Sequence, residues 1–334
     1  MSENHFTLEK EKYYTELKLM RRKKIKLIID TDPGVDDATA LVFALTNPRF
    51  DIKLFTITNG NIPMSKATRN MCHILDLFNK DIPVVVGRKA RYGNNTEDAI
   101  FLHGKEGLGA YQPPKTTNRQ PVEEDCTDLM FKIIKENPHE ITLVVLGPHT
   151  NLAKLLIKYP EAKKLLKRVV MMGGAPDGIK TNPNHNSFNI RTDAPAFAVT
   201  TYSKLRVIMC PSSIGRDIGY FTEEQVNNLK NYGDVGSFLY QTFQTFWEPN
   251  YPQKIIANND LCALYFLINP FLFFVRTAFV KVDTKEHIGK TIPKYNLLGN
   301  FKIVKWLYRR RFIKEVFNHL EKIKDLKLNF KTEQ

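Results

Sequence analysis

The chain has 334 residues, of which 43% are hydrophobic and 25% charged, so it is long and apolar enough for an extensive folded core and unlike a disordered chain. Residues 1–24 mix Glu with Lys around no apolar centre, and Asn269-Pro270 interrupts the most apolar stretch, residues 261–275. We therefore expect neither a signal peptide nor a membrane span. The four cysteines lack metal-ligand or disulfide-like spacing, which predicts reduced thiols in a cytoplasmic or nuclear compartment.

The formal net charge of +14 raises the question of a nucleic-acid partner. The basic residues gather at 21–26, 163–168 and 301–324, without a recognisable DNA- or RNA-binding motif around them. We interpret these clusters as solvated faces and expect no nucleic acid and no membrane among the partners. The run Arg21-Arg22-Lys23-Lys24 leaves a nuclear import signal open.

Apolar and amphipathic segments alternate along the chain as strands and helices. Strands are predicted at 25–29, 52–58, 82–86, 141–146, 168–172 and 205–209, and helices at 38–45, 64–78, 122–135, 152–158, 193–200 and on to about 247. The Gly-rich stretch 87–114 has no periodicity and is long enough to be a lid over a site, and residues 261–275 are predicted as a helix followed by a buried strand. The alternation predicts an α/β, Rossmann-like fold with a mostly parallel central sheet flanked by helices. We expect a single domain of residues 24–330 after an N-terminal extension of residues 1–23.

Four carboxylates fall within eight consecutive residues, at Asp30, Asp32, Asp36 and Asp37. Asp32 is predicted at the carboxyl end of a strand, and Asp36 and Asp37 in the first turn of the next helix, where backbone N–H groups favour negative charge. Acids that lie so close together either raise one another's pKa or bind a cation. A set of oxygen ligands suits calcium or magnesium rather than zinc. The simpler interpretation is that Asp36 caps the helix while Asp37 points to solvent.

Polar residues follow other predicted strands as well. Right-handed strand–helix–strand connections bring the loops after successive parallel strands to one edge of a sheet, where open sheets of this class bind ligands. We therefore expect Asp32, Asn61, Thr150 and the loop 173–189 to meet at that edge.

Six segments, taken in order, resemble motifs of the nucleoside hydrolase family, inosine-uridine preferring type. They are Asp30–Ala38 (DTDPGVDDA), Thr58–Asn61, His103–Gly109 (HGKEGLG), Leu146–Ala153 (LGPHTNLA), Met172–Asn189 and Asn259-Asp260. The resemblance covers residues from about 25 to 320, and its first motif is highly specific. It implies an enzyme that hydrolyses the N-glycosidic bond of ribonucleosides to free base and ribose, and that assembles as a homodimer or homotetramer.

The resemblance also implies roles for individual residues. One calcium ion per subunit would be held by Asp32, Asp37, the backbone carbonyl of Thr150 and Asp260, together with water and the ribose 2′- and 3′-hydroxyls. Asp36, Asn61 and Asn189 would contact the ribose hydroxyls, Met172 would form part of the ribose floor, and Asp32 would be the general base.

The chemistry of the reaction agrees with these roles. Hydrolysis builds positive charge on the sugar and needs a nucleophilic water, which a dication and an adjacent Asp32 can supply near neutral pH. Carboxylates around the anomeric carbon stabilise an oxocarbenium-like transition state. A metal that binds both ribose hydroxyls would also reject 2′-deoxynucleosides, because the loss of one ligand leaves the site unsatisfied.

Each residue also has a simpler structural interpretation. Asp260 would cap the helix that starts near residue 261, and Thr150 would cap the helix 152–158. Asn61 and Asn189 are common turn residues. In the same way, His103 would be a surface histidine in the long loop, and Met172 a core side chain.

Two departures from the family pattern affect substrate recognition. The family has an acid that holds the ribose 5′-hydroxyl where this chain has Ser187, so Asn182, Asn184 or His185 would have to compensate. The family also has a histidine or an aromatic residue where this chain has Asn259, and asparagine cannot deliver a proton to the departing base at useful pH. Trp247, with Phe243 one helical turn before it, could stack on the base or belong to the core, and His103 is the alternative acid.

Three other functions stay open from the sequence. The first is a catalytically weakened nucleoside- or ribose-binding protein that keeps the calcium ion. The second is an aspartyl-phosphate phosphotransferase, suggested by the Asp30-x-Asp32 pattern, although Pro33-Gly34 follows where such enzymes have threonine or valine. The third, a nucleic-acid binding protein, depends on charge alone.

Overall fold

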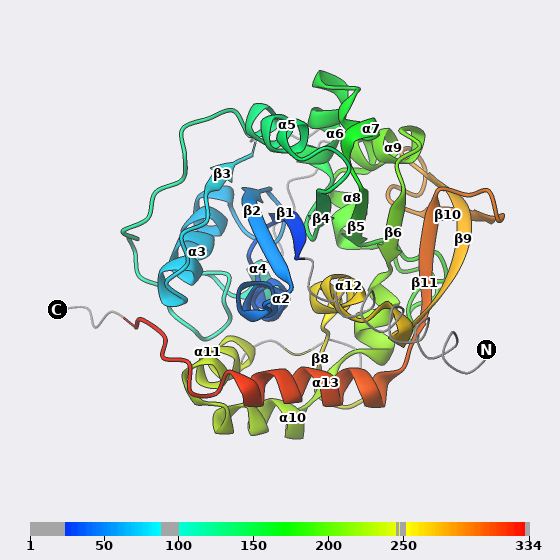
Figure 1. Cartoon of the computed structure of the whole chain (residues 1–334). Coiled ribbons are helices and arrows are strands. Elements are labelled where there is room, and N and C mark those ends of the chain that lie inside the picture. Colours follow the sequence, from blue (N-terminus) through cyan, green and yellow to red (C-terminus); the bar gives the residue numbers. More distant parts are fainter. Residues whose placement is uncertain (1–23, 88–99, 245–246, 248–251, 331–334) are drawn as a thin grey trace, which may run out of the picture.

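The computed structural model describes residues 24–87, 100–244, 247 and 252–330. Within these ranges a central nine-stranded sheet has the order β10-β9-β11-β6-β5-β4-β1-β2-β3 (Figure 1). Its strands are β1 Ile25–Thr31, β2 Phe50–Ile57, β3 Val84–Val86, β4 Thr142–Val145, β5 Arg168–Met172, β6 Val207–Cys210, β9 Phe273–Val282, β10 Thr291–Tyr295 and β11 Phe301–Leu307. The predicted N-terminal extension, residues 1–23, lies outside the described residues.

Seven neighbouring strands, from β11 through β6, β5, β4, β1 and β2 to β3, are parallel. β9 is antiparallel to both of its neighbours, β10 and β11. The predicted α/β, mostly parallel sheet is therefore confirmed. The prediction that β9 is a buried strand is wrong, because its residues alternate between core and solvent, as they do where only one face of a sheet is covered.

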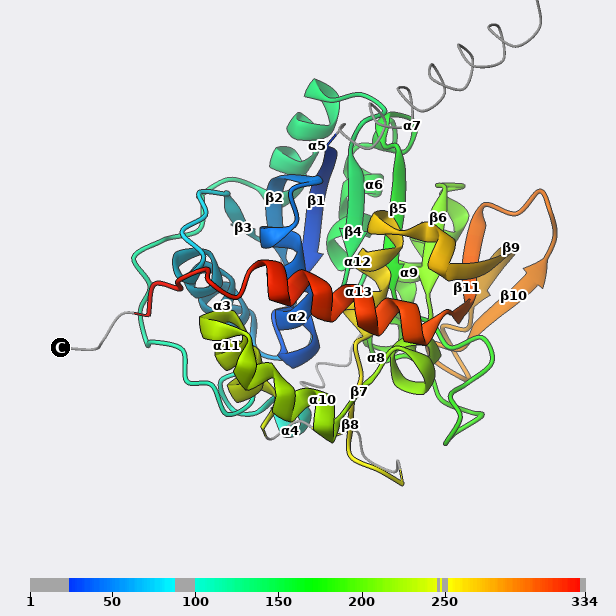
Figure 2. The same cartoon turned by 60° about the horizontal axis from the view of Figure 1, so that its bottom comes forward.

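Helices cover both faces of the sheet in two layers (Figures 1 and 2). Apolar side chains of one layer form a core with β1 and β2, and those of the other pack against β4, β5 and β6. The first layer holds α2 Val35–Thr46, α3 Met64–Leu77, α11 Gly233–Phe243, α12 Asn259–Ile268 and α13 Arg309–Lys322, and the second holds α5 Cys126–Glu136, α6 Thr150–Lys158, α7 Ala162–Leu165 and α9 Ala194–Tyr202.

Shorter elements connect these layers. They are the helices α4 Ile100–His103, α8 Phe188–Thr192 and α10 Glu223–Asn228, a π-helical turn η1 Ile214–Ile218, two 3₁₀ turns at Leu229–Asn231 and Pro270–Leu272, and the paired strands β7 Phe221–Thr222 and β8 Ile255–Ile256. All four cysteines lie in described residues, and none forms a disulfide. Within the described ranges, no helix combines the length and the apolarity that crossing a bilayer requires.

Several predicted helix boundaries differ from the structure, and the differences are largest at the start of α5 and the end of α11. Helix α5 begins at Cys126 and not at 122, because the Asp125 side chain accepts hydrogen bonds from the backbone N–H groups of Thr127 and Asp128 and so caps the helix there. Helix α11 ends at Phe243, whereas the pattern predicted helix as far as about residue 247.

The topology brings four polar segments to one edge of the sheet. Asp32 directly follows β1, Asn61 follows β2, Thr150 begins the helix after β4, and Met172 ends β5. Because these four strands are adjacent and parallel, their carboxyl ends lie side by side. The loops there are the ones that the sequence predicted to converge.

Candidate metal centre and active site

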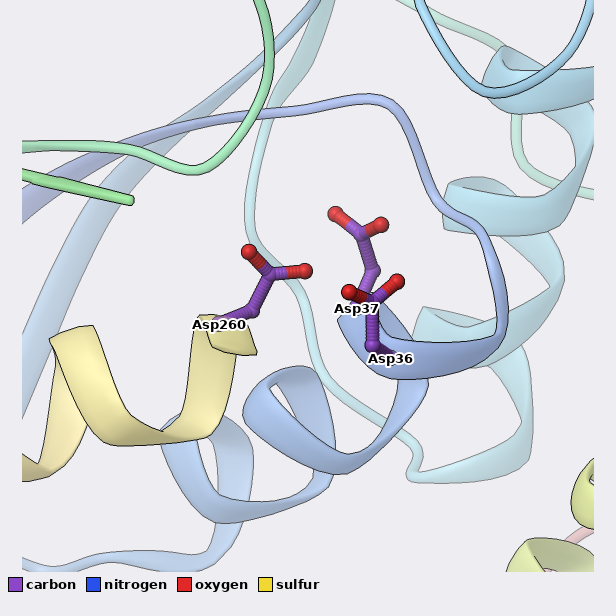
Figure 3. A group of neighbouring side chains, drawn as sticks. All are labelled: Asp36, Asp37 and Asp260. Carbon is purple, nitrogen blue, oxygen red and sulfur yellow. The ribbon is translucent and has the colours of Figure 1, made fainter. Parts of the chain in front are cut away.

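Three buried carboxylates meet at the carboxyl edge of the sheet. Asp36 and Asp37 come from the first turn of α2 and Asp260 from the first turn of α12, and oxygens from all three lie within 4.8 Å of one another (Figure 3). Helices α2 and α12 pack against each other, so the two helix N-termini bring their acids to one point. The grouping of Asp37 with Asp260 is the one that the resemblance to the family implied. Asp36, expected as a sugar ligand, joins the same cluster.

Asp32 occupies a narrow slot beside this cluster. An added Cβ on Gly60 would lie 1.8 Å from its Oδ2 atom, and one on Gly147 would lie 2.6 Å from its Oδ1 atom. The backbone N–H of Asn61 donates a hydrogen bond of 2.7 Å to Oδ2. The side chain is therefore held between the loops after β2 and β4. Gly60 and Gly147 were part of motifs in the sequence, but nothing there indicated that they form the walls of this slot.

Asp37 is fully buried and accepts three hydrogen bonds. The donors are the hydroxyl of Thr31 at 2.5 Å, the backbone N–H of Gly34 at 3.0 Å and the side-chain amide of Asn61 at 3.0 Å. The simpler interpretation, in which Asp36 caps α2 and Asp37 points to solvent, is wrong: it is Asp37 whose side chain accepts from the N-cap backbone. Asn61 links Asp37 to Asp32.

Burial raises the pKa of Asp32, Asp37 and Asp260 above their ordinary value, and the negative charges of the neighbouring acids raise it further. One carboxylate oxygen of Asp32 and one of Asp260 are buried without a hydrogen-bond partner among the described residues. Such buried acids need either protons or a cation, and a cluster of carboxylate oxygens suits a hard divalent ion. The three-carboxylate cluster, with Asp32 beside it, can therefore bind a metal.

Asp30 lies on β1, two residues before Asp32, and is fully buried. It accepts hydrogen bonds from the hydroxyl of Thr56 at 2.5 Å and the side-chain amide of Asn151 at 2.8 Å. Burial raises the pKa of Asp30 to about 7. The amide of Asn151 also reaches the carbonyl of Ile57 on β2, at 3.1 Å. Asn151 therefore joins β1, β2 and α6 behind the site, a role that the sequence did not reveal.

Thr150 is the first residue of α6, and its side chain does not cap the helix. The N-cap residue is His149, so the interpretation of Thr150 as the N-cap is wrong. Its hydroxyl donates a hydrogen bond of 2.6 Å to Asp193, the N-cap of α9. Asp260 is likewise not a cap, because Asn258 occupies that position in α12.

The comparisons with known proteins agree with this geometry. The sequence profile described as "Inosine-uridine preferring nucleoside hydrolase" matches residues 27–314. The chain belongs to the nucleoside hydrolase family. It is therefore a hydrolase that acts on N-glycosyl compounds.

One curated relative and two solved structures show what this family member is similar to. The non-specific ribonucleoside hydrolase RihC of Salmonella newport is 33% identical over 261 residues, which cover 78% of this chain and 84% of that protein. A plant nucleoside hydrolase, PpNRh1, superimposes with a TM-score of 0.82 at 27% identity and covers 89% of this chain and 98% of that one. The purine-preferring ribonucleoside hydrolase of Gardnerella vaginalis gives a TM-score of 0.83 at 25% identity, over 90% and 99% of the two chains.

Two of the residues predicted to contact the sugar, Met172 and Asn189, lie at the end of β5 and on α8. Asn189 is buried on α8, and its side-chain amide donates to the carbonyl of Leu146 and lies 3.4 Å from the sulfur of Met172. Met172 is half-buried, packed against the core at the end of β5. Ser187, which stands where the family has an acid, is fully buried, and its hydroxyl has no hydrogen-bond partner among the described residues.

The three residues expected to compensate for Ser187 lie just before it. Asn182 and Asn184 are exposed and belong to a local turn, in which the Asn182 side chain accepts from the backbone N–H of Asn184 at 2.9 Å. His185 is half-buried, and its Nε2 atom lies 3.1 Å from a guanidinium nitrogen of Arg216 on η1. Of the three side chains, His185 is the one that contacts another element, η1.

His103 and Asn259 both lie at the acid cluster. His103 is buried, so its interpretation as a surface histidine is wrong, and its Nδ1 atom accepts a hydrogen bond of 3.1 Å from the backbone N–H of Val35. That bond requires the neutral ring to carry its proton on Nε2. Burial lowers the pKa of His103 to about 4. The Asn259 amide lies 3.5 Å from an oxygen of Asp36.

The two aromatic residues near the end of α11 have different surroundings. Phe243 is fully buried and makes an edge-to-face contact with Phe221, with the ring centroids 6.2 Å apart, so it is a core residue. Trp247 is half-buried beyond the end of the helix, and the Lys254 ammonium lies 5.4 Å from the centre of its ring. The two rings are therefore not a pair on one helix face.

Proposed function

We propose that this protein catalyses the calcium-dependent hydrolysis of ribonucleosides to free base and ribose. The single observation that carries the proposal is the buried acid cluster at the carboxyl edge of the sheet, with Asp32 fixed beside it and carboxylate oxygens still lacking partners. The relatives named as ribonucleoside hydrolases support the substrate class.

The cation would be held by Asp32, Asp37, Asp260 and the carbonyl of Thr150. Calcium is favoured over magnesium because magnesium sites in proteins use one or two carboxylates and keep several waters, whereas this site gathers four buried acids if Asp36 is included. When bound, the ion would supply a positive charge that lowers the pKa of a water molecule and orients the ribose hydroxyls.

Asp32 is the residue that we assign as general base. Its carboxylate is fixed by the Asn61 backbone N–H and by the two glycine loops, so it can accept a proton from water without first reorganising. Asp36 and the other acids around the anomeric carbon would stabilise the positive charge that develops on the sugar in the transition state.

The sugar would be bound by Asp36, Asn61 and Asn189, with Met172 beneath it. A site that uses both ribose hydroxyls discriminates against 2′-deoxyribose, because a buried oxygen or metal position would then lose its partner. We expect 2′-deoxynucleosides to be poor substrates for this reason.

This chain has few groups that could assist departure of the base. Asn259 can donate a hydrogen bond but holds no acidic proton. His103 is neutral near pH 7, because burial keeps its pKa low, so its Nε2–H group would also act by hydrogen bonding. Trp247 would contact the base by stacking. We infer that the base leaves with hydrogen-bond assistance rather than by full protonation. We also propose that the enzyme is cytoplasmic and assembles as a homodimer or homotetramer.

The test is release of base from inosine, uridine, adenosine and guanosine by the wild type and by Asp32→Asn. We expect turnover by the wild type and a loss of about 10²- to 10⁴-fold in the variant with unchanged circular dichroism. The matched control is Asp128→Asn, an exposed acid that pairs with Lys158 at the opposite end of α6 from Thr150, and it should keep full activity. Retained turnover in Asp32→Asn would refute the role of Asp32. Binding of nucleosides by the wild type without any base release would favour the weakened binding protein instead.

A further inference from the structure

The basic residues that are scattered along the sequence converge at the opposite edge of the sheet, where the parallel strands begin. Lys24 precedes β1, Arg49 precedes β2, Lys167 precedes β5, Arg206 precedes β6 and Lys302 lies at the start of β11. The amino-terminal edge therefore collects positive charge from segments nearly 280 residues apart, while the acids collect at the carboxyl edge. We call the Lys and Arg side chains at these strand beginnings, on the neighbouring α7 and in the turn before β6 the basic edge.

Three adjoining hollows open along the basic edge, with volumes of about 430, 470 and 390 Å³. The first lies between α7 and the turn before β6, and Lys163, Lys164 and Lys204 line it. Lys167 lines all three hollows, and Arg206 lines the first two, so the hollows form one continuous surface. A charged surface that is concave surrounds a ligand, which raises its electrostatic attraction above that of a flat face.

Positive charge on this surface greatly exceeds negative charge. Ten Lys or Arg side chains line the three hollows, against a single acid, Glu140. Glu140 forms an ion pair with Lys26. Within the described part of the chain, Lys163, Lys164 and Lys204 form no ion pair, and all three are exposed. These three lysines are therefore available to a ligand with several negative charges.

The backbone beneath the basic edge is fixed by hydrogen bonds between neighbouring loops. The backbone N–H of His139 donates to Leu165 at 2.6 Å, that of Lys167 to Ile141 at 2.9 Å, and that of Val169 to the carbonyl of Arg206 at 2.9 Å. His139 and Lys204 both adopt left-handed backbone conformations, with φ of 60° and 61°, which turn the chain sharply at the first hollow. The cationic side chains thus project from rigid attachment points, which reduces the entropy lost when a ligand binds.

We propose that the basic edge is a binding site for a small oligophosphate, a compact molecule that carries several phosphate groups. A second copy of this chain does not fit, because two such faces repel each other. A single-stranded nucleic acid fits less well, since no Phe, Tyr or Trp among the described residues lines the hollows and stacking of bases on aromatic rings is the usual support for that binding. The proposal is independent of the hydrolase activity at the other edge.

The experiment is titration calorimetry of the full chain with inorganic tripolyphosphate at 150 mM salt. The test variant carries Lys163→Glu, Lys164→Glu and Lys204→Glu. The matched control carries Lys281→Glu, Lys285→Glu and Lys294→Glu, three exposed lysines of the β9–β10 hairpin that line none of the hollows. We expect saturable binding by the wild type, a loss of roughly tenfold or more in the test variant and a loss below about threefold in the control. Affinity should fall as salt is raised.

Three outcomes would overturn the proposal. The first is the absence of tripolyphosphate binding. The second is an equal loss in the two triple variants, because binding would then follow net charge and not the basic edge. The third is binding of a 20-base-pair duplex more tightly than tripolyphosphate, lost in the test variant, which would assign the surface to nucleic acid. Base release by both variants should equal that of the wild type, so failure of this proposal is distinguishable from failure of the proposed hydrolase function.

Discussion

Replacing Gly60 with alanine should inactivate the site without changing any group that takes part in the reaction. The new methyl carbon would lie 1.8 Å from the Oδ2 atom of Asp32, whereas real contacts of this kind are not shorter than 3.0 Å. The Asp32 carboxylate must therefore move by more than about 1 Å, and it would lose the 2.7 Å hydrogen bond from the Asn61 backbone. Misplacing a catalytic group by about 1 Å can lower a rate about 100-fold, which corresponds to about 2.7 kcal/mol of transition-state stabilisation.

The assay is kcat for base release from inosine or uridine, with thermal unfolding as the measure of the fold. Gly147→Ala should give a smaller decrease, since its methyl carbon would lie 2.4 Å from the Thr58 methyl group and 2.6 Å from Asp32, so that Thr58 takes part of the clash and Asp32 moves less. Gly236→Ala is the control for a steric clash elsewhere, because its methyl would lie 2.0 Å from the Leu229 carbonyl in the α11 region. The control should lower the melting temperature and leave kcat of the folded protein unchanged. A Gly60→Ala protein with kcat within threefold of wild type would refute the fixed position of Asp32.

Three further predictions concern the leaving group, the metal and pH. Asn259→His places an ionisable group beside Asp36. It should raise kcat/KM for nucleosides with poor leaving groups more than for p-nitrophenyl riboside. Equal effects on kcat/KM for both substrates would contradict assistance to the leaving base. Thr31→Val removes the hydroxyl that donates to Asp37 and should weaken calcium binding about 10- to 100-fold in a calorimetric titration, and an unchanged affinity would contradict this supporting role. Because burial raises the pKa of Asp30 to about 7, and raises that of Asp260, the metal-free folded state binds more protons than the unfolded chain above pH 3.8. The melting temperature of the metal-free protein should therefore fall as pH rises from about 4 to 7, and calcium should raise it most at pH 7; a metal-free melting temperature that rises over this range would contradict the assignment.

The fold and the acid cluster could be predicted because their signals are local in the sequence. Residues 25–29 read as a buried strand, and Asp36 and Asp37 follow a Pro-Gly turn into a helix, so neighbouring positions are enough to bring these acids together. Parallel strand order then brings the loops after β1, β2 and β4 to one edge. The seven parallel strands agree with this reasoning. The pairing of Asp37 with the distant Asp260 had no local signal and was implied only by the resemblance to the family.

Other features could not be predicted because they depend on register and packing between distant segments. The loops after β2 and β4 approach Asp32 so closely that Gly60 and Gly147 have no room for a methyl group. The hydrogen bond from Asn151 to Asp30 joins residues 121 positions apart. His103 looked like a surface residue, but its loop folds onto the start of α2 and buries it. The basic clusters were interpreted as separate solvated faces, since only the strand order reveals that Lys24, Lys167 and Lys302, one from each cluster, lie at one edge.

The most direct test of the central claim is base release from inosine and uridine before and after removal of divalent cations. The protein is treated with a chelator, its metal content is measured by atomic spectroscopy, and activity is followed as calcium is restored. If the buried carboxylates hold a cation that the reaction requires, activity should be lost with the metal and return with about one calcium per chain. Full activity in protein shown to be free of divalent metal would contradict the account.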